Sequence, residues 1–268
     1  MSLMSNVVTR LELKTVHVYN FEQAGVQELV IYDDFDTYRS DGQFRKKTPG
    51  RVGKNSDEVS ARDRGIAIAR AKKTLRRVAL HNQLTRLMTL TTQENIGDFE
   101  RLDGLFKKFI FGLRDHYPDF KYIGVRERQK RGAVHYHLLI NRYIPQAVAH
   151  KLWVSLVKKG TADFRFVEGL QAINYCLKYL GKSMEDPFVT KKGHNAKSYL
   201  CSTSLDRDFK KSRKVIHFYM QCLQDYFAYE DFLRSLPLSQ DNVFFDKIST
   251  FDVAGETKEC RSILLKTG

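Results

Sequence analysis

FKYIGVRERQKRGAVHYHLLINR, residues 120–142, contains two apolar runs separated by a short basic segment that includes a glycine. Runs rich in valine, isoleucine and tyrosine are typical of strands, and a glycine permits a tight turn between them. This stretch therefore predicts a β-hairpin. Its second half, residues 132–140, reads GAVHYHLLI and places two histidines in an otherwise apolar strand.

The segments on either side of the hairpin extend this pattern to a fold. Residues 85–93 predict a strand and residues 98–117 a helix with apolar side chains at helical spacing. After the hairpin, residues 145–160 predict a helix, 162–169 a short strand and 170–184 a second helix. The order β-α-β-β-α-β, followed by one more helix, predicts an α+β fold. We expect a ferredoxin-like (split βαβ) antiparallel sheet covered by helices.

The rest of the chain adds a segment at each end of this domain. Residues 1–56 contain two strand-like runs and a polar, basic loop, and residues 191–268 are expected to form a helical extension. Residues 57–190 hold the predicted domain, which begins with a basic helix over residues 57–81. Phosphate contact and a solvated helix face explain the basic side chains equally well. The expected DNA-binding residues of this helix are Arg70, Lys72, Lys73, Arg76 and Arg77.

The composition favours a polyanionic partner. The 268 residues include 45 Lys and Arg against 31 Asp and Glu, a net charge of +14. Such an excess favours nucleic acid first and an anionic membrane surface second. No run approaches the roughly 18 apolar residues of a membrane span, and the N-terminus lacks a signal-peptide hydrophobic region. The four cysteines lack a paired metal-ligand spacing and are predicted to be reduced thiols, so we expect a cytoplasmic protein without membrane association.

The two histidines of the hairpin share one face of their strand, because successive side chains of a strand alternate. His135 and His137 can therefore bind one divalent ion together; two ordinary hydrogen-bonded histidines are the alternative. If residues 130–132 form a three-residue loop with a left-handed glycine, Glu127 lies directly across from His135. A two-residue loop would turn Glu127 away. A Glu/His/His set suits Mg²⁺, Mn²⁺ or Zn²⁺, and the sequence does not choose among them.

A second polar group lies on the last predicted helix, in YCLKYLGK, residues 175–182. Tyr175, Lys178, Tyr179 and Lys182 are spaced i, i+3, i+4 and i+7, so they project from one helical face. Tyrosines at the edge of a core, with lysines reaching solvent, are the alternative. A phenol has a pKa of about 10 and needs help to become a nucleophile. A neighbouring ammonium can supply it by stabilising the phenolate or a phosphate, so this set suits attack on a phosphodiester.

Three motifs resemble those of a known superfamily. HYHLL, residues 135–139, resembles the His-hydrophobic-His motif of HUH endonucleases. YCLKYLGK resembles the tyrosine motif of their rolling-circle replication initiator (Rep) branch, and LMTLTT, residues 87–92, resembles the first motif of that branch. The motif order fits the Rep branch, and the chain is most similar to plasmid and phage initiators with a YxxxY arrangement. The resemblance covers about residues 64–184 and implies an HUH nuclease domain.

The resemblance implies a metal-dependent nickase and strand transferase that acts on single-stranded DNA at a replication origin. A tyrosine would attack the phosphate, keep the 5′ end as a phosphotyrosine and free a 3′-hydroxyl that primes synthesis. Which tyrosine cuts first stays open. By position, the resemblance implies metal ligands His135, His137 and Glu127, nucleophiles Tyr175 and Tyr179, assisting lysines Lys178 and Lys182, and DNA contacts from the first-motif strand at Thr89 and Thr91.

The expected partner is an origin strand that forms a hairpin or stem-loop. The sequence has no nucleotide-binding motif, so a host or plasmid helicase is a candidate second partner. The oligomeric state and the role of the two end segments stay open. A non-catalytic DNA- or RNA-binding protein on a ferredoxin-like fold is the main alternative. A related relaxase or transposase is another, although relaxases place the nucleophilic tyrosine before the histidines.

Overall fold

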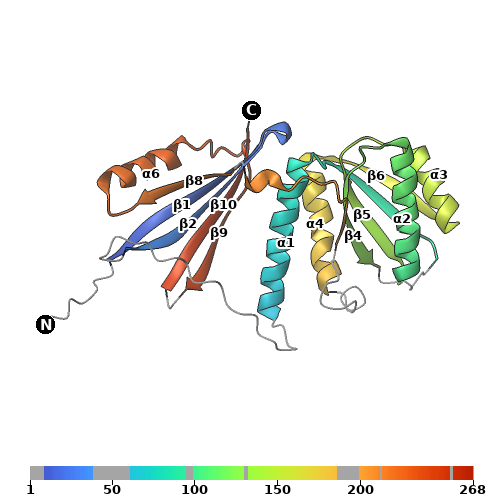
Figure 1. The fold of residues 1–268 in the computed structure, drawn as a ribbon, viewed down its shortest axis with the longest axis horizontal. Helices are drawn as coiled ribbons and strands as arrows, with labels where there is room; N and C mark the ends of the chain where they lie inside the picture. The colour runs from blue at the N-terminus through green and yellow to red at the C-terminus, as the bar shows by residue number, and fades with distance from the viewer. Residues whose placement is uncertain are drawn as a thin grey trace. The chain divides into compact units, whose positions relative to one another are not determined.

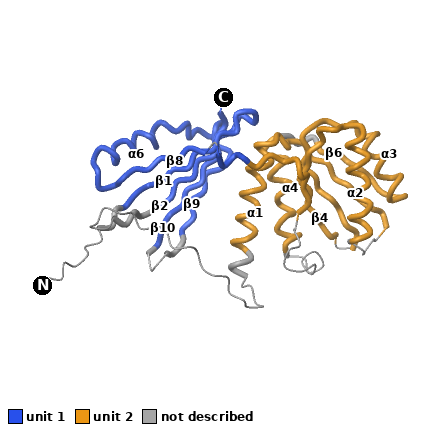
Figure 2. The backbone as a smooth tube through the Cα atoms, in the orientation of Figure 1, with its two compact units in different colours: residues 1–56, 208–268 blue, residues 57–207 orange. Residues whose placement is uncertain are grey.

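The chain folds into two compact α+β units. The computed structural model describes residues 9–38, 61–94, 99–129, 132–185, 199–211, 213–253 and 256–267. Unit 1 comprises residues 1–56 and 208–268, and unit 2 comprises residues 57–207 (Figure 2). Unit 2 is thus inserted, in sequence, between the first and the last strands of unit 1. Each unit contains one five-stranded antiparallel sheet.

Unit 2 has the predicted ferredoxin-like arrangement (Figure 1). Its sheet has the order β6-β3-β5-β4-β7, and α2 and α3 provide the two crossover connections. The β3-α2-β4-β5-α3-β6 order confirms the prediction, and β7 adds a fifth strand. The strands are β3 (Arg86–Thr92), β4 (Tyr122–Arg128), β5 (Val134–Ile140), β6 (Gly160–Glu168) and β7 (Tyr199–Cys201). The helices are α1 (Ala61–His81), α2 (Phe99–His116), α3 (Gln146–Val157) and α4 (Gly169–Glu185).

The two faces of the unit 2 sheet have different roles. On one face, Val134, Tyr136 and Leu138 of β5 are fully buried in a core that α2 and α3 complete with Phe106 and Trp153. Helix α4 packs on the other face, against β3, β4, β5 and β6, and α1 packs on α4. The alternation of β5 therefore leaves the odd-numbered side chains facing α4, as the sequence predicted.

The β4–β5 hairpin sets the register of that face. Glu127 pairs with His135 across the two strands. Gln129 N donates to Ala133 O at 2.8 Å, Gly132 N donates to Gln129 O at 2.9 Å, and Gly132 has φ +90°. These contacts fit a three-residue connection that ends in a left-handed glycine. The predicted register is therefore confirmed, although residues 130 and 131 lie outside the described part of the chain.

Unit 1 consists of a sheet with one covering helix. Its strand order is β8-β1-β2-β10-β9, and α6 packs on one face with Tyr229 and Phe232 against Val16, Ile31 and Ile263. The strands are β1 (Thr9–Phe21), β2 (Val26–Tyr38), β8 (Lys214–Tyr219), β9 (Val243–Val253) and β10 (Glu256–Lys266). The helices are α6 (Leu223–Ser235) and two short 3₁₀ turns, η1 (Glu22–Ala24) and η2 (Asp208–Lys210).

The prediction of a helical extension over residues 191–268 is wrong. This segment contributes three strands to the sheet of unit 1 and one to that of unit 2, but only one α-helix among its described residues. Residues 214–219, read as part of an amphipathic helix, form β8 because they pair with β1 about 200 residues earlier in the chain. Local spacing does not reveal so distant a pairing. The basic loop predicted before residue 57 lies outside the described residues beyond Tyr38.

Gly160, the first residue of β6, gives a prediction about stability. A Cβ at this position would lie 2.4 Å from the backbone oxygen of Thr91 on the neighbouring strand. A backbone atom cannot move away cheaply, so we expect Gly160→Ala to lower the free energy of unfolding by about 2 kcal/mol. Gly104→Ala is the control, because nothing lies within 4 Å of its Cβ position in α2, and it should stabilise the protein by up to about 1 kcal/mol. Denaturant unfolding of both variants measures these opposite shifts; equal stability would contradict the close approach of the strands.

Candidate active site

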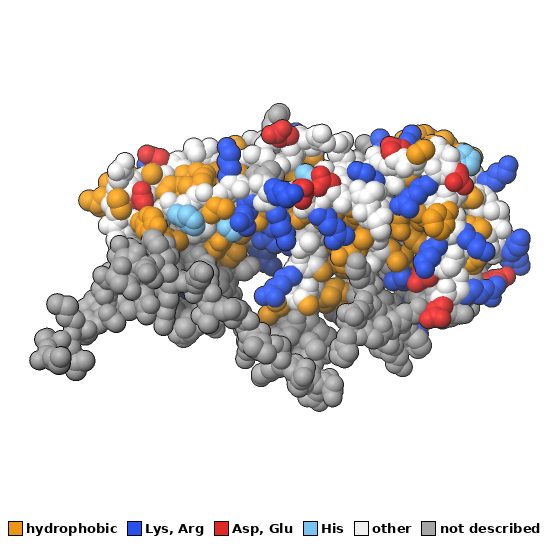
Figure 3. All heavy atoms as spheres, viewed as in Figure 1, with side chains coloured by type: hydrophobic (Ala, Val, Ile, Leu, Met, Phe, Trp, Pro, Cys, Tyr) orange, Lys and Arg blue, Asp and Glu red, His pale blue; other side chains and the backbone are white. Residues whose placement is uncertain are grey.

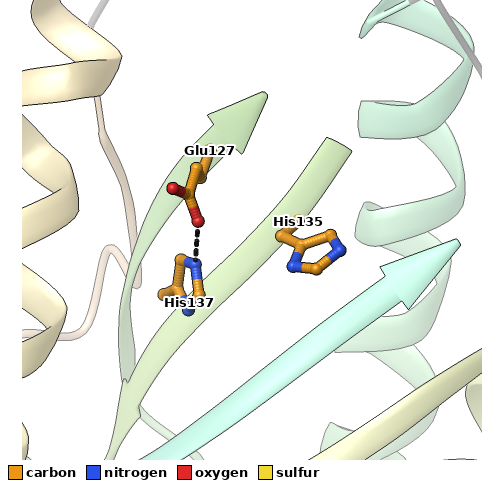
Figure 4. A group of neighbouring side chains, drawn as sticks. All are labelled: Glu127, His135 and His137. Carbon is orange, nitrogen blue, oxygen red and sulfur yellow. Dashed lines mark hydrogen bonds and ion pairs between the residues drawn. The ribbon is translucent and has the colours of Figure 1, made fainter. Parts of the chain in front are cut away.

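Three metal-ligating side chains converge on the face of the unit 2 sheet that α4 covers. Glu127 extends from β4, and His135 and His137 extend from β5 (Figure 4). Each offers one ligand atom, and these atoms lie within 4.8 Å of one another. Glu127 and His135 are half-buried, and His137 is buried. One carboxylate and two imidazoles are a donor set that could hold a divalent metal ion.

The histidine rings are oriented by polar neighbours. Thr89, which pairs with His137 across β3 and β5, has its hydroxyl oxygen 3.3 Å from His137 Nδ1. His137 Nε2 then lies 2.9 Å from Glu127 Oε2, as Figure 4 shows. The amide nitrogen of Gln129 is 3.4 Å from His135 Nδ1. Partners on the second ring nitrogen fix the orientation of a ligating histidine. Thr89, expected as a DNA contact, thus lies against His137.

The electrostatics of the group favour the protonation states that metal binding needs. Burial alone would raise the pKa of Glu127, but hydrogen bonds from Lys182 and His137 outweigh it and lower that pKa. Lys182 Nζ donates to Glu127 Oε1 at 2.8 Å. Burial lowers the pKa of His137, and the opposing hydrogen bond with Glu127 does not reverse this. An ionised carboxylate beside a neutral imidazole is the form in which both bind a cation.

Helix α4 brings the two predicted tyrosines to this group. The Tyr179 ring stacks on the His137 ring, with 3.8 Å between centroids and 10° between planes. The Tyr179 hydroxyl donates to the Tyr175 hydroxyl at 2.8 Å. Burial, the hydrogen bond with Tyr175 and the charge of Glu127 together raise the pKa of Tyr179. Tyr175 is half-buried and Tyr179 is 9% exposed. The strand and helix motifs therefore form one site.

The two lysines of the α4 motif differ in their contacts. Lys182, besides its bond to Glu127, lies 5.2 Å from the centroid of the Tyr179 ring. Lys178 is exposed, and no contact recorded among the described residues links it to the group. The apolar residues between the motif positions are buried, as a helix packed on a sheet requires. They are Ile173, Cys176, Leu177 and Leu180.

Arg165 is a site residue that the sequence did not indicate. It extends from β6, and its guanidinium carbon lies 4.4 Å from the centroid of the Tyr175 ring. Its positive charge also lowers the pKa values of His137 and Tyr179, as a lesser contribution in each case. The signal was the alternation of residues 161–165 along a strand. That pattern identifies a face only when the strand order β6-β3-β5 is known.

The hydroxyl of Thr91 lies on the same face, toward β6. Thr91 Oγ1 is 2.6 Å from Thr161 Oγ1, and the Thr161 hydroxyl donates to Asp163 Oδ2 at 2.8 Å. This polar row continues from the histidines across β3 to the edge strand. Thr91 therefore lies beside the candidate site but is already hydrogen-bonded within the sheet.

The basic helix predicted before the domain is α1, described from Ala61. Arg70 is exposed, whereas Lys72, Lys73, Arg76 and Arg77 are half-buried. Lys72 Nζ lies 3.5 Å from the position of a Cβ on Gly181, so α1 crosses α4 at this glycine. Ile66, predicted in the apolar stripe, is 40% exposed. The cationic side of α1 therefore extends to the tyrosine helix.

The positive charge of the chain belongs mainly to unit 2. This unit has 28 Lys and Arg against 15 Asp and Glu, whereas unit 1 has 17 against 16. In the face shown in Figure 3, Lys and Arg side chains are accordingly more numerous over unit 2. A basic surface on the unit that carries the site favours a polyanionic ligand there.

Fold and site together define an α+β protein with a ferredoxin-like sheet and a Glu/His/His group that could bind a metal ion. Residues 85–184 match the model of a family described as replication-associated protein ORF2. The match runs from the start of β3 to the end of α4, so it includes every residue of the group and both tyrosines. It supports a Rep-type, replication-associated protein that binds DNA. Curated proteins and solved structures gave no match to the chain. Among the described helices, none is long and apolar enough to cross a membrane.

Proposed function

We propose that the protein initiates rolling-circle replication as a metal-dependent nickase and strand transferase of the HUH type, acting on single-stranded origin DNA. The observation that carries this proposal is the stacking of Tyr179 on His137, with Tyr175 hydrogen-bonded to Tyr179. A binding protein has no need of candidate nucleophiles packed against a candidate metal ligand. The family match over residues 85–184 supports the same reading.

The donor set fits a divalent ion held by Glu127, His135 and His137, with Mg²⁺ or Mn²⁺ as the first candidates and Zn²⁺ as another. When bound, such an ion supplies positive charge that polarises a phosphate oxygen. Glu127 and His137 are already in the required protonation states. Thr89 holds His137 by its Nδ1 side, and Lys182 holds Glu127 by its Oε1 atom.

A tyrosine oxygen of α4 would attack the phosphorus of the scissile phosphodiester. The new bond joins this oxygen to phosphorus, and the bond from phosphorus to the 3′ oxygen breaks. The phenol gives up its proton, and the 3′ oxygen leaves as a hydroxyl that can prime synthesis. The 5′ end stays attached as a phosphotyrosine, whose reversal by a 3′-hydroxyl rejoins the strand. Lys178 and Lys182 would stabilise the phosphate charge during both steps.

The basic surface of unit 2 would hold the DNA strand, with Arg70 and its neighbours on α1 and the β3 hydroxyls nearest the site. Contacts of this kind release counterions, so binding should weaken as salt rises. An origin hairpin or stem-loop would present the strand, and a separate helicase would unwind the duplex.

The proposal is tested by trapping the covalent intermediate. We expect the protein, incubated with labelled single-stranded origin DNA and Mn²⁺ or Mg²⁺, to form an adduct that survives a denaturing gel. Tyr175→Phe combined with Tyr179→Phe should remove the adduct, because neither position then has a nucleophilic oxygen.

Tyr143→Phe is the matched control for this pair. It removes one exposed tyrosine hydroxyl in the segment before α3 and should leave the adduct unchanged. An adduct that persists in the double variant, or none with any origin-derived strand, would overturn the tyrosine mechanism.

A further inference from the structure

We propose that Arg165 on β6 is a positioning residue that makes Tyr175, rather than Tyr179, the first nucleophile. This inference rests on the proposed nicking function. It concerns a residue outside the three motifs, and it assigns an order to two tyrosines that the motif treats alike. The site is asymmetric in three respects: the cation on each tyrosine, the direction of their hydrogen bond, and their freedom to move.

The first asymmetry is the packing of Arg165. Its guanidinium carbon lies 4.4 Å from the centroid of the Tyr175 ring, a distance typical of a cation–π contact. A guanidinium that packs on a ring through its face keeps N–H donors at its edge, where they suit a phosphate oxygen. Arg165 is exposed, so this edge is open to a ligand. The contact holds the Tyr175 ring and places positive charge beside its oxygen.

The second asymmetry is the hydrogen bond between the phenols. Tyr179 donates and the Tyr175 oxygen accepts, at 2.8 Å. A donor directed at an oxygen stabilises the negative charge that develops there as the proton leaves. The arrangement thus assists a Tyr175 phenolate and leaves Tyr179 as the neutral phenol that supports it.

The third asymmetry is the confinement of Tyr179. Its ring is stacked at 3.8 Å on His137 and is 9% exposed, whereas Tyr175 is half-buried between α4 and Arg165. To reach a phosphate, Tyr179 would have to break its bond to Tyr175. Esterification of Tyr175 turns the accepting hydroxyl into a phosphate ester and so weakens that bond. Tyr179 would then become available for a second cut.

The order can be measured directly, because trypsin separates the two tyrosines. Cleavage after Arg165, Lys178 and Lys182 yields one peptide of residues 166–178 with Tyr175 and another of residues 179–182 with Tyr179. After nuclease trimming of the DNA, mass spectrometry gives the share of adduct on each peptide. In the wild type, at the first turnover, we expect at least about 90% of the adduct on the peptide with Tyr175, a ratio near the 10-fold effect of one favourable cationic contact.

Arg165→Gln is the decisive variant. We expect its first cut to slow about 10-fold and the share of adduct on Tyr179 to rise several-fold, while Arg165→Lys should restore part of the rate because it keeps the charge without the planar cation. The share is a ratio within one sample, so a partly unfolded variant still reports it. The matched control is Arg142→Gln, which removes a similar contact, 4.6 Å from the Tyr117 ring centroid, outside the site.

Each outcome separates the inference from the function on which it rests. An adduct shared equally by both peptides in the wild type, or unchanged in its distribution by Arg165→Gln, would overturn the role of Arg165 and leave the nicking activity standing. An adduct on neither peptide would overturn the proposed function, and the inference with it. Tyr179→Phe provides an independent check: the adduct should stay on Tyr175 and form more slowly, because its donor is lost.

Discussion

Replacing both His135 and His137 by alanine is expected to lower DNA nicking at least about 1000-fold and to leave most DNA binding intact. Charge stabilisation by a bound metal contributes several kcal/mol to such a reaction, and each 1.4 kcal/mol is about a factor of ten in rate. The basic side chains of α1 and of the sheet edge are untouched by the change. Binding should therefore fall with salt as it does in the wild type.

The measurement has three parts: adduct formation, DNA affinity, and the rise in melting temperature on adding Mn²⁺. Wild-type protein should be stabilised by Mn²⁺ because a ligand that binds only the folded state raises its stability. The double variant should show no such rise. His135→Ala alone guards against misfolding, since His135 is only half-buried and makes no stack with Tyr179.

His150→Ala is the matched control, an exposed histidine on α3 beyond the opposite face of the sheet. It should change neither nicking nor the response to Mn²⁺. Nicking by the double variant at the wild-type rate would rule out a metal at this group. Loss of DNA affinity in proportion to loss of nicking would instead indicate that the histidines contact DNA.

The sequence predicted the unit 2 sheet because its signals are local. Alternation along residues 134–140 defined two faces, and Gly132 defined the turn that pairs Glu127 with His135. The i, i+3, i+4 spacing on α4 likewise predicted that Tyr175 and Tyr179 share a face. Each of these inferences spans fewer than about ten residues, over which backbone geometry fixes side-chain direction.

Features that depend on distant pairing were not predictable in this way. Strand β8 pairs with β1, and β10 pairs with β2, from opposite ends of the chain. Arg165 reaches Tyr175 only because β6 joins the sheet beside β3. Thr89 looked like a DNA contact, but its register opposite His137 makes it a partner of that ring. In all three cases, strand order supplied what local spacing did not.

The opposite face of the hairpin carries the largest expected effect on stability. Asp103 of α2 accepts two hydrogen bonds from Arg126, at 2.9 and 2.7 Å, and one from the Tyr136 hydroxyl at 3.0 Å. Arg126 and Tyr136 pair across β4 and β5, immediately beside the Glu127–His135 pair. Asp103 therefore ties α2 to the hairpin directly behind the candidate metal group.

Asp103→Ala is expected to lower the free energy of unfolding by about 3 kcal/mol, because it leaves the Arg126 guanidinium without its carboxylate where only 11% of that side chain is exposed. An isolated buried charge is far less stable than the pair. Asp103→Ala combined with Arg126→Met should recover much of the loss, since an apolar side chain of similar length needs no counterion. Denaturant unfolding measures both variants.

Asp119→Ala is the control for this pair. Asp119 also bonds an arginine, Arg142, but its side chain is 66% exposed, so its removal should cost under about 1 kcal/mol. A loss in Asp103→Ala no larger than in this control would show that the network does not hold the hairpin. The double variant discriminates further: if it stays as unstable as Asp103→Ala, the cost lies in the helix itself. If it recovers stability and also nicks DNA, the network serves only to hold α2 against the strands that carry Glu127 and His135.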